Sequence, residues 1–435
     1  MKSTDSKNTP HGTEQLRSSY SARNNSPKKI LFVAEAVTLA HVGRMITLAS
    51  GLDQNRYTPL LAWDTRFQEI TGDLPGKHYP LPSISTELFL ERLYKGRPTY
   101  DFDTLNQYVK DDLHLLQTTK PVAVVGDTRL SLAVSAALAG IPYLNVVNAH
   151  WSPYAQTEWV VPQCAFVDAV GPFLGQFGFD LLRPLFFREY AKGFNRLFKK
   201  WGLPSLGCDV RKIYCAGDLT LYPDLPELIP TQGLPTTHRF LGPVAWSPSM
   251  RNPDMLQHPV PGKKTVYIAM GTSGNAKALP AILDGLKSFP LRVLVAAGAN
   301  SSVFNPNPAH LELHVSPYFS GQAACQSADL VINNGGSASI NQCLLAGVPF
   351  LGLASNLDQF SSMFYSEKAG IGKTIRADRV TPSAIARGAE ELLNDPAWSQ
   401  RASTMSAIAQ TYNPSKILMQ GIEHLLSTRS AEQGR

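Results

Sequence analysis

The chain has 435 residues, a formal net charge of +6 and 43% hydrophobic residues. This length fits two domains of ordinary size, and the small, evenly spread basic excess indicates no nucleic-acid-binding surface. The five cysteines form no C-x-x-C pair, which argues against structural zinc and favours reduced thiols in a cytoplasmic protein.

The first segment, residues 1–28, is polar and rich in Ser, Asn and Lys. Because it has no apolar core, we expect a disordered tail and no secretory signal. Further along, residues 130–149 carry no charge and approach the length of a membrane span. Gly140 and Pro142 interrupt that stretch, which favours a buried helix followed by a buried strand.

Residues 29–242 predict an N-terminal Rossmann-like domain, since apolar strand segments alternate with amphipathic helices. Such alternation is typical of a parallel sheet with helices on both faces. The expected strands are 28–35, 57–64, 121–127 and 141–149, and the expected helices are 41–53 and 130–140.

The pattern is interrupted between Tyr154 and Trp201, where aromatic residues mix with Arg and Lys. A Pro-rich stretch without periodicity, 243–264, is the predicted linker. Alternation resumes in 265–412, which predicts a second Rossmann-like domain. The last segment, 413–435, is expected to form a helix and tail that pack back on the N-terminal domain.

Two turns of the second domain predict an anion site. The sequence "VINNGGSAS" ends a strand, turns at Gly335 and Gly336, and starts a helix near Ser337. The glycines let a ligand approach the backbone, and the helix offers free amides and the positive end of its dipole. A second turn of this kind, "MGTSG", also separates a strand from a helix. Ligands of such sheets lie beyond the carboxyl ends of the strands.

The run "NGGSASINQCLLAGVP", followed by Asp-Gln, resembles the C-terminal signature of the family 1 nucleotide-sugar glycosyltransferases, the UDP-glycosyltransferases. That signature reads H-G-G-x-G-T-x-x-E-A-L-x-x-G-V-P. The segments "YIAMGTS" and "AHVGRMITLASGL" are similar to other family segments and occur in family order. The resemblance implies the GT-B fold, an α/β architecture of two Rossmann-like doubly wound parallel-sheet domains. They face each other across a cleft, with the acceptor on the first domain and the donor on the second.

The resemblance also implies how a UDP- or dTDP-sugar donor is held. Gly336 and Ser339 would contact the diphosphate, Gln342 the ribose, and Asp358 and Gln359 the sugar hydroxyls. The full set of donor residues that it implies is Gly271, Thr272, Ser273, Val315, Tyr318, Asn334, Gly335, Gly336, Ser337, Ser339, Gln342, Asp358 and Gln359.

The family histidine and the family's base platform are both replaced in this chain. Asn334 replaces the family histidine, so it can donate a hydrogen bond to phosphate without bringing charge. Val315 and Tyr318 stand where the family has the tryptophan and glutamine of its base platform. Tyr318 or Phe319 is an alternative stacking face, and the identity of the base stays open.

His41 and Asp127 are the expected catalytic pair. Each follows a strand at its carboxyl end, and the resemblance pairs an aspartate at this place with the base histidine. Histidine suits proton removal at neutral pH, and a carboxylate orients it. An alternative role for Asp127 is helix N-capping, which the same side chain can combine with the first. We expect no metal and no cofactor, because amides and helix dipoles can neutralise a diphosphate.

The segment 181–202 combines aromatic and basic residues, and three interpretations stay open. It can line a pocket for a small or lipophilic acceptor, present a solvated basic face, or touch a membrane surface. The basic residues for such a contact are Arg188, Lys192, Lys199 and Lys200.

The function that the resemblance implies is an inverting transfer of a hexose to an acceptor hydroxyl, in the cytoplasm or at the inner face of the membrane. One alternative is a degenerate homologue that binds nucleotide sugar without turnover, kept open by Asn334. A membrane-surface enzyme with a lipid acceptor is another, although the G-G-x-G-G-H loop of one such class is missing. An oxidoreductase is disfavoured because no G-x-G-x-x-G follows the first strand.

Overall fold

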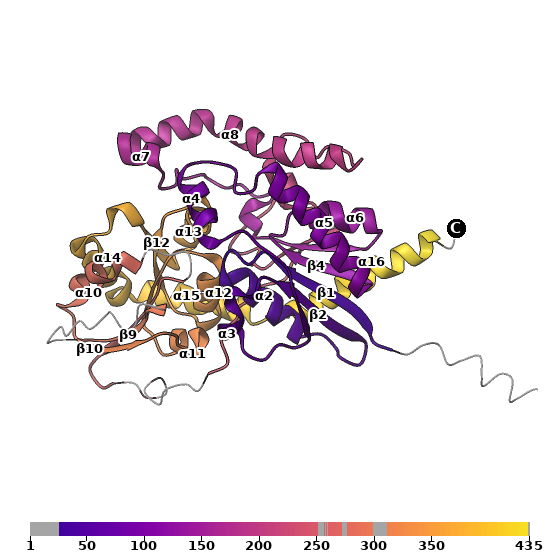
Figure 1. Cartoon of the computed structure of the whole chain (residues 1–435). Coiled ribbons are helices and arrows are strands. Elements are labelled where there is room, and N and C mark those ends of the chain that lie inside the picture. The colour runs from indigo at the N-terminus through magenta and orange to yellow at the C-terminus, as the bar shows by residue number, and fades with distance from the viewer. Residues whose placement is uncertain are drawn as a thin grey trace, which may run out of the picture.

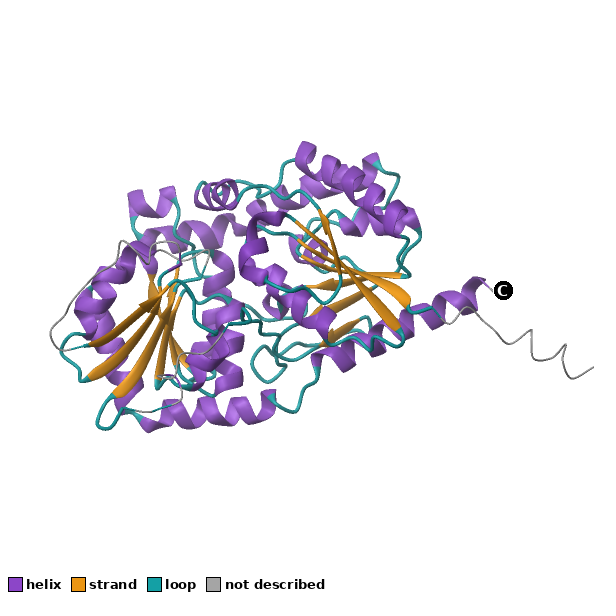
Figure 2. Ribbon diagram, turned by 60° about the horizontal axis from the view of Figure 1, so that its bottom comes forward, coloured by secondary structure: helices purple, strands orange, loops and turns teal. Residues whose placement is uncertain are grey.

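The computed structural model describes residues 26–250, 256, 258, 260–271, 276–298 and 311–433. Two α/β domains each contain one parallel sheet with helices on both faces (Figures 1 and 2). This arrangement agrees with the predicted fold class. Buried apolar side chains of both domains, including Tyr222, Leu225, Tyr267 and Phe319, belong to one continuous cluster.

The N-terminal sheet has seven strands in the order β3-β2-β1-β4-β5-β6-β7, all parallel. β1 is buried on both faces from Ile30 onward, as expected for a parallel strand under two helical layers. The strand order reverses between β1 and β4, so their carboxyl ends frame a crevice. The strands are β1 (Lys28–Ala34), β2 (Tyr57–Trp63), β3 (Lys77–Pro80), β4 (Ala123–Asp127), β5 (Tyr143–Val146), β6 (Leu219–Tyr222) and β7 (His238–Phe240).

Helices cover this sheet and extend beyond it. α2 lies against β1, β2 and β4 and buries the apolar face that its sequence spacing predicts. The segment that interrupts the alternating pattern forms α7 and α8, which run along the top of the molecule in Figure 1. The helices are α2 (Leu39–Ser50), α3 (Gln68–Thr71), α4 (Thr86–Tyr94), α5 (Phe102–Thr119), α6 (Leu132–Ala139), α7 (Ala165–Val170), α8 (Pro172–Lys200) and α9 (Val210–Tyr214).

The C-terminal sheet has six parallel strands in the order β10-β9-β8-β11-β12-β13. Its order reverses between β8 and β11, which repeats the geometry of the first domain. The strands are β8 (Lys264–Ala269), β9 (Leu291–Ala296), β10 (Glu312–Ser316), β11 (Leu330–Asn333), β12 (Phe350–Ala354) and β13 (Gly372–Arg376).

The C-terminal helices include one that leaves its own domain. α16 crosses back and packs against α2 and β6, where Leu418 and Ile422 are fully buried. The two chain segments that connect the domains lie against each other, since a Cβ added at Gly242 would lie 2.3 Å from Tyr412 Cβ. The helices are α10 (Leu279–Leu286), α11 (Gly321–Gln326), α12 (Ser337–Ala346), α13 (Leu357–Lys368), α14 (Pro382–Asn394), α15 (Pro396–Ala409) and α16 (Pro414–Gln433). None of the helices in the described part of the chain combines the length and the apolar character that crossing a bilayer requires.

Candidate functional site

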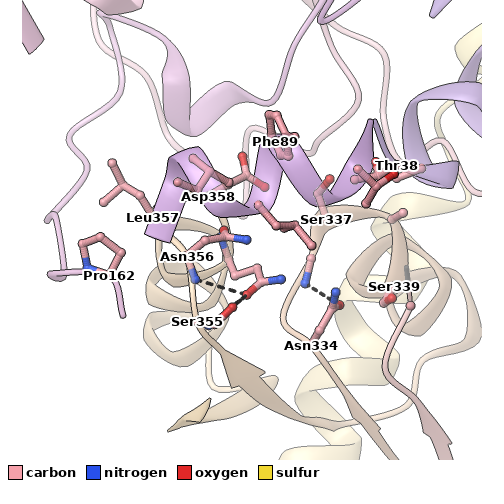
Figure 3. A pocket seen from close by; sticks show the side chains of 18 of the residues that line it. Thr38, Phe89, Pro162, Asn334, Ser337, Ser339, Ser355, Asn356, Leu357 and Asp358 are labelled. Atoms are coloured by element: carbon pink, nitrogen blue, oxygen red, sulfur yellow. Dashed lines mark hydrogen bonds between the residues drawn. The ribbon is translucent and has the colours of Figure 1, made fainter. Parts of the chain in front are cut away.

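A cavity of about 1340 Å³ lies between the carboxyl ends of the two sheets. Figure 3 shows Asn334, Ser337 and Ser339 from the C-terminal domain, with Thr38 and Phe89 from the N-terminal domain, around it. Both domains therefore contribute to one open cavity that is large enough for two substrates.

His41 and Asp127 meet at the N-terminal wall of this cavity. His41 Nδ1 lies 2.9 Å from Asp127 Oδ1, and the carboxylate is fully buried. An ionised carboxylate only accepts hydrogen bonds, so in the tautomer that donates to it from Nδ1 the basic nitrogen is Nε2; Arg44 Nη2 also lies 3.0 Å from Nδ1. Among the described residues no hydrogen bond to Nε2 is found, and His41 lines the cavity. The pair has the geometry of a general base and its orienting carboxylate.

Arg44 completes this cluster. It is 3% exposed, and its Nε lies 2.7 Å from Asp127 Oδ2. One helical turn separates it from His41, so both side chains project from the same face of α2. Burial raises the pKa of Asp127, but the charges of Arg44 and His41 outweigh it and hold that pKa below its ordinary value. Asp127 therefore stays ionised and cannot become a competing acid at neutral pH.

The residue after Asp127 has a strained backbone. Thr128 has a φ of 59°, a left-handed conformation that is uncommon for a β-branched side chain. Its hydroxyl donates to Asp127 Oδ1 at 2.9 Å. The next residue, Arg129, is buried and forms ion pairs with Glu35 and Asp112. This ion-pair network anchors the turn that carries the carboxylate.

Asp127 does not cap a helix, contrary to the alternative interpretation. α6 begins only at Leu132, with Ser131 in the N-cap position, because the chain first makes the turn through Thr128. The side chain of Asp127 is engaged instead by His41 and Arg44.

The donor-side turn depends on glycine. Gly335 has a φ of 71°, and a Cβ there would lie 2.7 Å from Met363 Cγ. Gly336 precedes the first residue of α12, and its N–H donates to Asn334 Oδ1 at 3.1 Å. Asn334 thus folds its own turn, and its amide nitrogen lies toward Gly271 in the facing turn after β8.

One amide oxygen joins the two halves of the site. Asn148 Oδ1 accepts from Arg44 Nη1 at 2.9 Å and from Ser337 Oγ at 3.1 Å. The first residue of α12 is therefore connected to the carboxylate of Asp127 through two side chains of the N-terminal domain. Asp224 holds the Asn148 amide group in place by accepting from its Nδ2.

The remaining donor positions lie in different surroundings. Tyr318, Ser339 and Gln342 line the cavity, and Gln342 Nε2 donates to the backbone oxygen of Trp246 at 2.8 Å. Val315, expected at the base platform, does not line it: this side chain lies in β10 and packs against the core, whereas Tyr318 and Phe319 do line the cavity. Thr272 and Ser273 lie outside the described residues.

Asp358 is held by the N-terminal domain. Its Oδ1 accepts from His150 Nε2 at 2.8 Å and from Trp151 Nε1 at 2.9 Å, while the side chain stays 44% exposed. Desolvation raises the pKa of Asp358, but His150 and Trp151 hold it well below its ordinary value. The carboxylate is ionised, with its exposed part lining the cavity.

Gln359 contributes to the start of α13. Its Oε1 accepts from Ser355 N at 2.8 Å and from Asn356 N at 3.3 Å, which closes a capping box at the start of α13. Its Nε2 is buried without a hydrogen-bond partner among the described residues. The amide oxygen is therefore committed to the fold, and the nitrogen alone is free for a ligand.

Sequence reasoning missed four residues of this site: Arg44, Asn148, His150 and Trp151. The spacing of His41 and Arg44 on one helix was the available signal for Arg44. The other three follow β5 at its carboxyl end, in the short turn that contains the 3-10 helix Ala149–Trp151, so the strand-end rule also applied to them.

Curated relatives of this chain are named as glycosyltransferases, which agrees with the family expected from the sequence. The chain is 39% identical over 387 residues to a Mycobacterium tuberculosis protein named PGL/p-HBAD biosynthesis glycosyltransferase, covering 89% of each. It is 40% identical over 379 residues to the PGL/p-HBAD biosynthesis rhamnosyltransferase of Mycobacterium bovis, covering 87% of this chain and 84% of the relative. Another M. bovis relative, 42% identical over 262 residues, is named an inactive PGL/p-HBAD biosynthesis glycosyltransferase; the match covers 60% of this chain and 72% of that one. No family profile matches the chain.

Solved structures share the fold. The spinosyn rhamnosyltransferase SpnG superposes with a TM-score of 0.66 at 16% identity, over 90% of this chain and 99% of SpnG. SpnG complexed with thymidine diphosphate gives a TM-score of 0.63 at 16% identity, with the same coverage. At this identity the likeness concerns the arrangement of the two domains.

Proposed function

The chain belongs to the glycosyltransferase family of these mycobacterial relatives and has the GT-B fold, and we propose that it catalyses the following sugar transfer. It moves a hexose-type sugar from a nucleoside diphosphate sugar to a hydroxyl of a lipophilic acceptor, with inversion at the anomeric carbon. The single observation that carries the proposal is the buried His41–Asp127 pair at the wall of a cavity that both domains line.

His41 acts as the general base of this transfer. Its Nε2 takes the proton of the acceptor hydroxyl while the acceptor oxygen forms its bond to the anomeric carbon. The bond from that carbon to the diphosphate oxygen breaks, and the electron pair leaves with the nucleoside diphosphate. Asp127 stabilises the imidazolium that forms, through the hydrogen bond to Nδ1. Attack opposite the leaving group inverts the configuration.

The diphosphate is received by the turn before α12. Free amides at the start of this ten-residue helix and the positive end of its dipole favour an anion. Asn334 adds an amide donor to that turn, and Asp358 faces the cavity for contact with sugar hydroxyls. We propose that these groups suffice and that no metal or cofactor takes part.

The acceptor is lipophilic in this proposal. The N-terminal part of the cavity is lined by apolar side chains of α4 and α8, among them Phe89, Leu90, Leu93, Phe179 and Phe187. Relatives at 39–40% identity are named for PGL/p-HBAD biosynthesis, and one of them is named a rhamnosyltransferase. Rhamnose is therefore the first sugar to test, with UDP and dTDP as nucleotides because SpnG binds thymidine diphosphate.

The test measures release of nucleoside diphosphate by the full chain from UDP- and dTDP-linked sugars. Alkylated phenols and alcohols serve as acceptors, with and without EDTA. Product formation that survives EDTA, with the anomeric configuration inverted by NMR, is the expected result. A retained configuration would refute the one-step mechanism, and loss of activity with EDTA would refute the metal-free site.

A second candidate function is nucleotide-sugar binding without turnover. Asn334 in place of the family histidine favours it, and a relative covering 60% of the chain is named inactive. A chain that binds UDP or dTDP in calorimetry yet transfers no sugar to any acceptor, and that Asn334→His does not activate, would establish this alternative.

A further inference from the structure

The outer face of α7 and α8 exposes large apolar side chains. Phe173 is 87% exposed, Phe177 74% and Leu181 69%. These residues are four positions apart, so they form one stripe along α8, which Leu185 continues. Leu174 is exposed beside this stripe, whereas the exposed Phe166, Leu182 and Phe186 border the cavity. Such a contiguous surface is unusual on a protein that faces only water.

The stripe lies on a well-anchored helix. In the second half of α8, Ala191, Phe194 and Leu197 are buried against the core, and the helix packs on α5 and α9. Figure 1 shows α7 and α8 along one edge of the molecule. The first half is thus presented outward by a fixed support and does not belong to a loose end of the chain.

Basic residues continue the same face of the helix. Arg188 follows Leu185 by three positions, and Lys192 follows Arg188 by four. Both side chains are exposed. Residues 165–200 contain six bases (Arg183, Arg188, Lys192, Arg196, Lys199 and Lys200) and three acids (Asp168, Asp180 and Glu189), a net charge of +3. An apolar stripe that continues into a basic one is typical of a helix lying in the interface of an anionic bilayer.

The opposite face of α8 lines the cavity. Gly175, Phe179, Leu182, Phe186 and Tyr190 all border it. Their spacing of three or four residues places them on the side of the helix away from Phe173 and Phe177. One helix therefore separates the outer apolar surface from the space that leads to His41.

We propose that α7 and α8 dock the enzyme on an anionic membrane surface and that a lipid acceptor enters the cavity beneath α8 directly from that surface. This proposal rests on the proposed function for the nature of the acceptor. It explains why apolar side chains occupy both faces of a helix that does not cross a membrane. A second copy fits this surface less well, because a two-fold contact would bring two patches of like charge together.

The docking test measures sedimentation of the full chain with vesicles of phosphatidylcholine, with or without phosphatidylglycerol. The wild type should bind mainly the anionic vesicles, and Phe173→Ser with Phe177→Ser should lower that binding ~10-fold or more. Leu138→Ser is the matched control, because it removes an exposed apolar side chain on α6 and should change nothing. Lys192→Gln with Lys199→Gln should weaken binding to the anionic vesicles alone.

Three outcomes would overturn the proposal. The first is that the double serine variant still binds the vesicles. The second is that Leu138→Ser weakens binding as much as the double serine variant does. The third is that the wild type forms a concentration-dependent dimer that the double serine substitution dissociates. Thermal unfolding of each variant shows that it remains folded, which the exposure of these side chains leads us to expect.

Turnover separates this proposal from the proposed function. The double serine variant should keep wild-type turnover with a short-chain, water-soluble acceptor and lose at least ~10-fold with a long-chain acceptor presented in anionic vesicles. A wild type without turnover on either acceptor would refute the proposed function, while its vesicle binding would still decide the docking surface. Equal turnover of wild type and variant on the vesicle-bound acceptor would refute the entry route.

Discussion

The two domains place their functional groups at equivalent points of equivalent folds but hold them by different means. At the β1/β4 crevice, three charged or ionisable side chains, His41, Arg44 and Asp127, are bonded to one another and largely buried. At the β8/β11 crevice, the turn of Asn334 and Gly335 depends on main-chain conformation and on one side-chain amide.

The proposed function accounts for this difference. Proton transfer needs a base whose tautomer and orientation are fixed, and side-chain charges fix them. A diphosphate is a large anion with many acceptor oxygens, and a row of backbone amides suits it without a fixed counter-charge. Changes at the first crevice should therefore affect rate and stability, and changes at the second should affect affinity.

The largest expected effect is on turnover. His41→Ala removes the base, so kcat should fall ~10²–10⁴-fold while the affinity for nucleoside diphosphate stays the same. Steady-state kinetics and calorimetric titration measure the two quantities. His114→Ala, at an exposed histidine of α5, is the matched control. A folded His41→Ala enzyme with wild-type turnover would show that the first crevice does not do the chemistry.

Arg44→Gln should cost the most stability. It leaves the buried carboxylate of Asp127 without its strongest counter-charge, at a cost of about 3–5 kcal/mol in the free energy of unfolding. Urea denaturation measures this quantity. Arg56→Gln, which breaks the exposed ion pair with Glu423, should leave the curve nearly unchanged. Equal small losses in both variants would mean that Arg44 is not part of the scaffold.

The second crevice is tested by Asn334→Ala. Removing one hydrogen bond to a charged group should weaken UDP or dTDP binding by about 1.5–3 kcal/mol, or roughly 10–100-fold. Asn334→His should restore binding and raise turnover, because a histidine can donate with more positive character. If Asn334→Ala lowered kcat without changing affinity, the division between the two crevices would be wrong.

Gly335→Ala addresses the backbone of the same turn. The positive φ and the contact with Met363 should together cost about 1–3 kcal/mol of stability. Gly233→Ala is a matched control, since its φ is 64° and nothing lies within 4 Å of the added Cβ. The difference between the two melting temperatures isolates the contact with Met363. No difference would indicate that the turn yields to the new methyl group.

The smallest effect is a shift in the pH dependence. Arg44 is the largest of the charges that hold the pKa of Asp127 low, so Arg44→Gln should change how the free energy of unfolding depends on pH in the acid range. The stability that ionised Asp127 contributes is present above its unfolded pKa and is lost as pH falls through its lowered folded value. In the variant the folded pKa of Asp127 is no longer held as low, so this loss should be smaller and should end at higher pH. An identical pH dependence of urea unfolding in the wild type and the variant would show that Arg44 does not hold the pKa of Asp127 low.

The sequence predicted the parts of the site that depend on chain order. Strand alternation placed His41, Asp127 and Asn334 at carboxyl ends, and the structure brings the first two within hydrogen-bond distance. The sequence could not reveal that Arg44 and Ser337 share an acceptor in Asn148, because those residues come from three distant segments. Short strands such as β3, with half-exposed residues, carry too little periodicity to be recognised.

The two segments that connect the domains meet at Gly242 and Tyr412, and this has a mechanical consequence. Because β1 and α16 both belong to the N-terminal domain, the C-terminal domain is in effect an insert held at two adjacent points. A force applied between Lys28 and Gln433 would first pull α16 off β6 and α2 and would bypass the C-terminal sheet. The buried cluster that both domains share would stay intact until the insert itself is separated from its neighbour.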